Sequence, residues 1–69
     1  SNQLTAVLEH YLILIRLTPD NALAHHNLGC FVHARAYIEH SKGDIKQAID
    51  YIKEAEGYFE RAIQLDTNT

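Results

Sequence analysis

Five histidines and a single cysteine are the residues of this chain whose chemistry could be used: His10, His25, His26, His33, His40 and Cys30. His26, Cys30 and His33 stand at i, i+4 and i+7, so a helix places them along one side. Histidines one turn apart can bind zinc, and thiolate with imidazole suits that metal. A fourth ligand is missing, and no carboxylate on this side orients the imidazoles. We therefore expect no metal and no other cofactor, and zinc binding at these three residues is the least favoured of our hypotheses.

Nucleophilic catalysis is not expected either. Cys30 has His26 and His33 within reach on the same helix, but the sequence offers no oxyanion hole and no third orienting group. Acidic residues such as Glu54 and Glu60 alternate with lysines and arginine and fit a solvated face. The three glycines are isolated, so they do not form a phosphate-binding loop. We expect no catalytic residues and no enzyme activity.

Size and charge narrow the possible partners. The chain has 69 residues, 46% of them hydrophobic, which suits one small globular unit. A net charge of -3 and a pI near 5.9 argue against nucleic acid or an anionic membrane as the partner. The longest apolar run ends at Arg16, short of a membrane span. A single cysteine forms no internal disulfide, so nothing in the sequence suggests an oxidising compartment. We therefore expect the protein to be located in the cytoplasm. The start at Ser1, without Met, leads us to expect a segment of a longer protein.

Three helices account for nearly the whole chain, over residues 3–17, 22–42 and 45–65. Pro19 ends the first, and Asp20 or Asn21 can cap the second. Gly43 is a left-handed stop, and Asp44 can cap the third helix. Because the loops have only two to four residues, neighbouring helices must pack antiparallel. The fold class is therefore all-α.

A segment of the first helix recurs 48 residues later in the third. Six positions share their spacing and are small or apolar at every place but the last: Val7, Tyr11, Leu14, Ile15, Leu17 and Pro19 align with Ala55, Phe59, Ala62, Ile63, Leu65 and Thr67. The third helix also carries an apolar stripe with steps of three, four and seven, which we expect to lie against a neighbour: Ile45, Ala48, Ile49, Ile52, Ala55, Phe59, Ala62 and Ile63. A repeated helical unit is typical of a solenoid, and solenoids usually hold a partner.

The region from Ala22 to Asn68 resembles a tetratricopeptide repeat. Leu28-Gly29 matches the Leu-Gly pair of the first helix, Gly43-Asp44 the turn, and Ala55, Phe59 and Ala62 the second-helix signature. The resemblance implies antiparallel helical hairpins of a right-handed superhelix. Residues 3–17 would be the second helix of a preceding repeat, and residues 22–66 one extended repeat. A helical hairpin outside this family is left open.

Several positions depart from the family pattern. His25 and Val32 stand where large aromatic residues are usual, and Thr67 replaces the closing proline. The repeat has 48 residues instead of 34, with seven extra residues in each arm. Seven residues are close to two turns, so the apolar face drifts only about 20°. Lengthening both arms equally keeps each face covered, and we expect a hairpin with two more turns in each helix.

The resemblance implies that the first helix of the hairpin lines a concave, ligand-facing surface. There we expect a protein or peptide to bind at His26, Asn27, Cys30, His33 and Tyr37. Asn27 matches an asparagine with which chaperone-binding members grip a peptide carboxylate. The cationic residues of that clamp have no counterpart, since Leu23, His26 and Cys30 stand in their places. The most favoured function is a non-catalytic protein–protein interaction scaffold.

Self-association is the alternative function. The first helix is apolar nearly all round, so one face can pack on the second helix while the other stays open. Open apolar patches favour association. We therefore expect that this helix can mediate a homodimer or end-to-end stacking of the chain.

Overall fold

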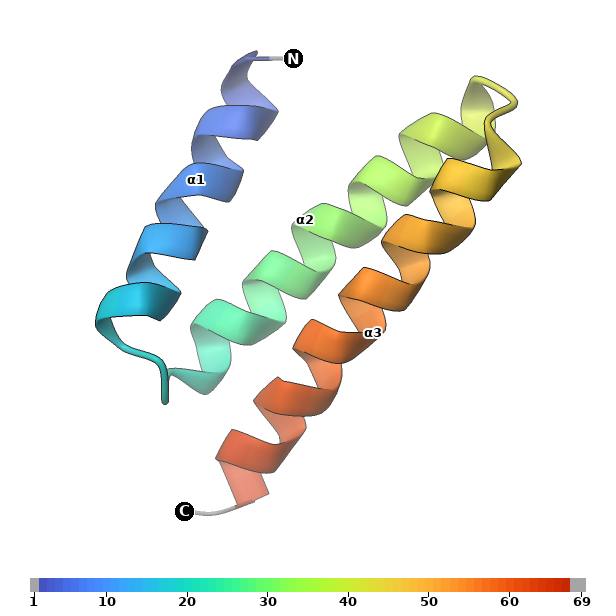
Figure 1. The fold of residues 1–69 in the computed structure, drawn as a ribbon. Helices are drawn as coiled ribbons and strands as arrows, with labels where there is room; N and C mark the ends of the chain where they lie inside the picture. Colours follow the sequence, from blue (N-terminus) through green and yellow to red (C-terminus); the bar gives the residue numbers. More distant parts are fainter. Residues whose placement is uncertain (1, 68–69) are drawn as a thin grey trace.

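The computed structural model describes residues 2–67, which form three α-helices joined by two short turns (Figure 1). Helix α1 spans Asn2–Leu17, α2 spans Ala22–Ser41 and α3 spans Ile45–Thr67. α2 runs between the other two helices, and α3 returns antiparallel to α2 (Figure 1). The Cα positions extend over 41 × 23 × 12 Å, so the helices form a flat layer. The all-α prediction is confirmed, and each predicted helix end lies within two residues of the observed one.

The first turn is held by hydrogen bonds from both of its sides. At the end of α1, the amide and the hydroxyl of Thr18 both donate to the Leu14 carbonyl. Asn21 caps α2, because its side-chain oxygen accepts from the Ala24 amide at 3.1 Å. His25 lies 3.1 Å from the Pro19 carbonyl through Nε2, which ties the turn to the first turn of α2. Of the two residues proposed as caps, Asn21 takes the role.

The second turn follows the geometry expected at Gly43. This residue has φ +88°, which an L side chain rarely adopts. The Asp44 amide donates to the Glu39 carbonyl and the Gly43 amide to the His40 carbonyl, which is a Schellman motif. Asp44 then caps α3, accepting from the Gln47 amide at 3.1 Å. These contacts reverse the chain and bring α3 alongside α2.

Small residues form the seam between α2 and α3. They recur every seven residues on both helices: Ala22, Gly29 and Ala36 on α2, and Ala48, Ala55 and Ala62 on α3. All of them are buried except Ala22, which is half-buried. Seven residues are close to two helical turns, so each set stays on one side of its helix. The distance between packed helices depends on the side chains at their contact, and small ones allow a close approach.

The buried core lies on the side of this hairpin that α1 covers. Leu28, Val32 and Ala55 form its centre. Six partly buried side chains pack around them, three from α1 and three from α3: Leu8, Tyr11, Ile15, Tyr51, Tyr58 and Phe59. The other side of α1 stays open, with Ile13 54% and Leu17 75% exposed.

The apolar stripe expected on α3 divides into two sets. Its alanines are buried in the seam, whereas Ile45, Ile49, Ile52 and Ile63 remain 41–64% exposed. The isoleucines lie on the flank of α3 that α1 does not cover. Within residues 2–67, α3 has α2 as its neighbouring helix, and α2 takes up only the alanine side. Part of the predicted buried face is therefore a surface.

Candidate protein-binding groove

A groove runs between α2 and α3 on the face of the hairpin that α1 leaves uncovered. We call it the front groove and define it by the residues on its two walls: Leu23, His26, His33, Tyr37 and His40 on α2, and Ile45, Ile49, Ile52, Phe59 and Ile63 on α3. The small residues of the seam form its floor. Its walls are larger side chains that the close approach of the helices leaves outside the seam. The groove thus follows directly from the heptad spacing of the small residues.

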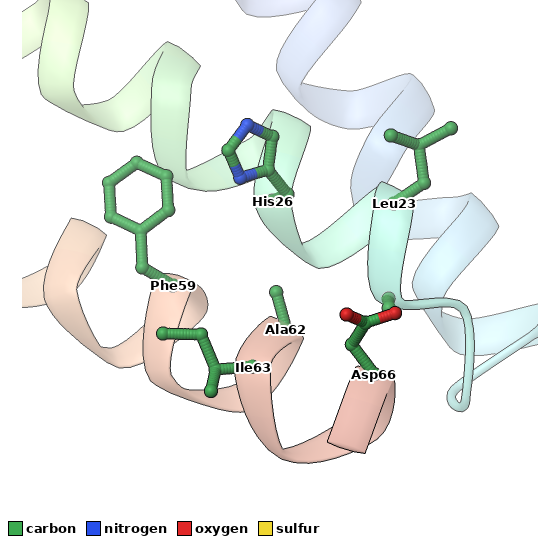
Figure 2. A pocket seen from close by; sticks show the side chains of 7 residues that line it. Leu23, His26, Phe59, Ala62, Ile63 and Asp66 are labelled. Carbon is green, nitrogen blue, oxygen red and sulfur yellow. The ribbon is translucent and has the colours of Figure 1, made fainter. Parts of the chain in front are cut away.

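The end of the groove near Asn21 contains a hollow of about 530 Å³ (Figure 2). The ring of His26 lies beside the ring of Phe59, with centroids 5.4 Å apart, and the two form one side of the hollow (Figure 2). Ile63 lines it from α3 and Leu23 from α2, both about two-thirds exposed. Asp66 supplies a carboxylate at this end (Figure 2). An apolar side chain would bury several aliphatic groups here.

The end near Gly43 contains a second hollow, of about 220 Å³. Four residues of α2 and four of α3 line it: His33, Ala36, Tyr37 and His40, and Ile45, Ala48, Ile49 and Ile52. Its surface is almost wholly apolar apart from the imidazole nitrogens and the tyrosine hydroxyl. Tyr37 is 69% exposed, so its ring is available to a partner. The two hollows lie in line along the hairpin.

Three of the five residues proposed as the ligand-binding face line the front groove: His26, His33 and Tyr37. Cys30 lies beside it, with its sulfur 3.7 Å from His26 Nε2. The fifth, Asn27, lies elsewhere. Its amide donates to the Tyr11 hydroxyl at 3.3 Å, so it joins α2 to α1. Residue 27 is one position, and hence about 100°, away from His26 around the helix. The structure therefore groups Asn27 with the α1 contacts, beside Phe31, whose ring lies 5.5 Å from that of Tyr11.

The histidine and cysteine side chains do not gather into a metal site. His26 Nε2 lies 3.7 Å from the Cys30 sulfur. Across residues 2–67, no group of three His, Cys, Asp or Glu side chains is close enough to hold a metal ion. Zinc binding at His26, Cys30 and His33 therefore gains no support.

The α3 wall of the groove was missed as a site in the sequence, although its residues were recognised as an apolar stripe. The sequence pattern indicated that its isoleucines are core residues, because a linear pattern does not show which apolar side chains a neighbouring helix will cover. These residues are Ile45, Ile49, Ile52 and Ile63. The available signal was the alanine heptad of α3. A helix contact made by small residues leaves the larger residues beside it on the surface.

Tyr58 lies on the opposite flank of the hairpin, toward α1. Partial burial raises the pKa of its phenol above the ordinary 10.0, and the neighbouring Glu54 carboxylate raises it further. Nearby, the Arg35 guanidinium stacks over the Tyr51 ring, 4.9 Å from its centroid. The α1 side of the hairpin therefore has packed aromatic rings with charged groups beside them, whereas the front groove is open and mainly apolar.

The chain has no match among protein-family models, curated proteins or solved structures. No helix within residues 2–67 is long and apolar enough to cross a membrane.

Proposed function

We propose that this chain is a non-catalytic interaction segment that binds a protein partner in the front groove. The observation that carries this proposal is the row of large apolar side chains left exposed along both walls, from Leu23 and Ile63 at one end to Tyr37 and Ile49 at the other. Contiguous apolar surface of this kind is typical of protein interaction sites. These side chains are 41–69% exposed, so covering the rest of one of them is worth roughly 1–2 kcal/mol.

The shape of the groove favours a helical partner segment. α2 has 20 residues, so the groove is about 30 Å long. A helix laid between α2 and α3 would meet both hollows with apolar side chains on one face, as amphipathic helices do in hydrophobic grooves. His26 and His33 would then supply polar contacts from the α2 wall.

We further propose that the three helices have the arrangement of a tetratricopeptide-like superhelix. Three features support it: the buried Leu28-Gly29 pair, the left-handed Gly43 in the turn and the Ala55-Phe59-Ala62 signature, in which Phe59 lies against Gly29. A cytoplasmic location is proposed on the grounds of a single, exposed cysteine.

The test is selection of helical peptides from a displayed library, followed by affinity measurement against variants. Ile49→Lys and Ile63→Lys each place a charge in one hollow and should weaken the selected peptides at least about tenfold. Ile13→Lys is the matched control, because it changes an isoleucine of similar exposure on α1. If groove and control variants bind alike, or no peptide is selected, the proposal fails.

Self-association through α1 is the second candidate function. The side chains of Leu12, Ile13 and Leu17 favour it, since all three are apolar and exposed on α1. Loss of a dimer in Ile13→Lys, with the dimer retained in Ile49→Lys, would support this candidate over the groove.

A further inference from the structure

We propose that the front groove binds the front groove of a second copy, so that two α2–α3 hairpins pack face to face and antiparallel. This inference rests on the proposed function, since it names the partner of the same groove. It places the dimer contact on the side of the hairpin opposite α1.

Heptad spacing on both walls supports this pairing. His26, His33 and His40 recur every seven residues on α2, and Ile45, Ile52 and Phe59 do so on α3. A seven-residue repeat keeps a face aligned with a partner helix along its whole length, as in coiled coils and four-helix bundles. The groove therefore has the periodicity that packing against other helices requires.

A two-fold axis that crosses the groove at right angles to the helices sets the register. It pairs α2 with α2 and α3 with α3, each in opposite directions. Gly29 lies against Phe59, and Ala36 and Ala48 line the same hollow, which fixes the middle of the hairpin near His33 on α2 and Glu54 on α3. The axis then faces His26 with His40 of the second copy. On α3 it faces Ile45 with Ile63 and Ile49 with Phe59, so each hollow receives large side chains.

The charges beside the α3 wall are complementary in this arrangement. Lys46 and Lys53 lie in the first half of α3, and Glu56 and Glu60 in the second. Antiparallel pairing brings Lys53 near Glu56 of the second copy and Lys46 near Glu60. The pair that Lys46 forms with Asp50 within the chain is long, at 3.8 Å, and the lysine side chain is 91% exposed, so it is free to rearrange. In the other face-to-face arrangement, α3 of one copy faces α2 of the second copy. The charged residues of α3 then lie against the uncharged edge of α2, and no such pairs form.

The available area is enough for a modest dimer. A hairpin face about 30 Å long and 20 Å wide offers about 600 Å² per copy. Two copies bury about 1,200 Å², at the lower limit for specific interfaces. The accessible surface of 4949 Å² also exceeds the roughly 4,400 Å² of a compact monomer of this mass, as expected for a flat layer of helices with open apolar faces.

The test is the solution mass of the full chain, by sedimentation over a concentration series up to about 1 mM, with paired charge variants. Lys46→Glu with Lys53→Glu gives an acidic variant, and Glu56→Lys with Glu60→Lys gives a basic one. Each alone should raise the dimer Kd at least about tenfold, because like charges then face each other along the two α3 helices. Mixing the two should restore a heterodimer. Ile13→Lys should leave the dimer unchanged, and circular dichroism checks that each variant stays helical.

Three results would overturn the inference: a wild-type monomer at the highest concentration, charge variants that dimerise like wild type, or a dimer that only Ile13→Lys disrupts. Its failure is distinguishable from failure of the proposed function. If the chain is a monomer that binds selected peptides in the groove, the dimer inference fails and the proposed function stands. If the chain forms a dimer of the expected register but selects no peptide, the dimer inference stands and the proposed scaffold function fails.

Discussion

The ring of Phe59 lies against the backbone of Gly29. A Cβ atom at position 29 would come within 2.7 Å of Phe59 Cε1 and 2.9 Å of its Cδ1. Carbon atoms do not approach so closely without a shift of one of them. The contact joins the middle of α2 to α3, and it puts an aromatic ring between the seam and the front groove.

Gly29→Ala should therefore destabilise the chain, although alanine favours a helix by about 1 kcal/mol. Overpacking of this kind costs about 1–3 kcal/mol, which outweighs the gain. Gly57→Ala is the matched control, because nothing lies within 4 Å of its added Cβ and it should stabilise by up to about 1 kcal/mol. Thermal and urea melts followed by circular dichroism measure both. A Gly29→Ala variant as stable as Gly57→Ala would show that the Phe59 ring moves aside freely.

His25→Phe should stabilise the chain by about 1 kcal/mol. The imidazole is buried with 8% exposure, and its Nδ1 has no hydrogen-bond partner in the structure. Phenylalanine removes this unpaired polar atom, and the Pro19 carbonyl that loses its bond can turn to water. His25→Ala is the control and should destabilise by about 2–4 kcal/mol, because it leaves a cavity. Urea melts that rank Phe below His would contradict the prediction.

Asn27→Ala should weaken the fold and leave groove binding intact. Losing the hydrogen bond to Tyr11 costs about 0.5–1.5 kcal/mol at a half-buried site. Affinity for a groove-binding peptide, measured by calorimetry, should stay within about twofold of wild type. Tyr37→Ala should do the reverse, lowering affinity with little change in the melt, since Tyr37 is exposed on the groove. Equal losses of affinity in the two variants would place Asn27 in the binding surface after all.

Tyr58 should make stability fall in strong base. Its pKa is raised in the folded state above the ordinary 10.0, so the folded chain holds this proton more tightly than the unfolded one. The contribution is complete below pH 10.0 and is lost as the pH rises through the folded pKa. Ultraviolet titration of the phenols and melts at rising pH measure the effect. Tyr58→Phe should flatten the pH dependence, and Tyr37→Phe serves as the control on the opposite flank.

Sequence alone determined what depends on near neighbours in the chain. Helix ends follow from Asn21, Gly43 and Asp44, whose caps and left-handed turn involve contacts within five residues. The antiparallel order follows from the short turns. The α2 wall of the groove was also predictable, since His26, His33 and Tyr37 share one helical side.

Tertiary structure decided which apolar residues became surface. The stripe of α3 is a single face in the sequence, but contact through the alanines Ala48, Ala55 and Ala62 buries one edge of it and exposes the other. Likewise, Asn27 was predicted to line the groove, but in the structure it links α2 to α1. Its amide donates to the hydroxyl of Tyr11, which is 16 positions away in the sequence. Periodicity fixes the direction of a side chain around its own helix. Which neighbour meets that direction, and how closely, depends on packing between segments that are distant in the chain.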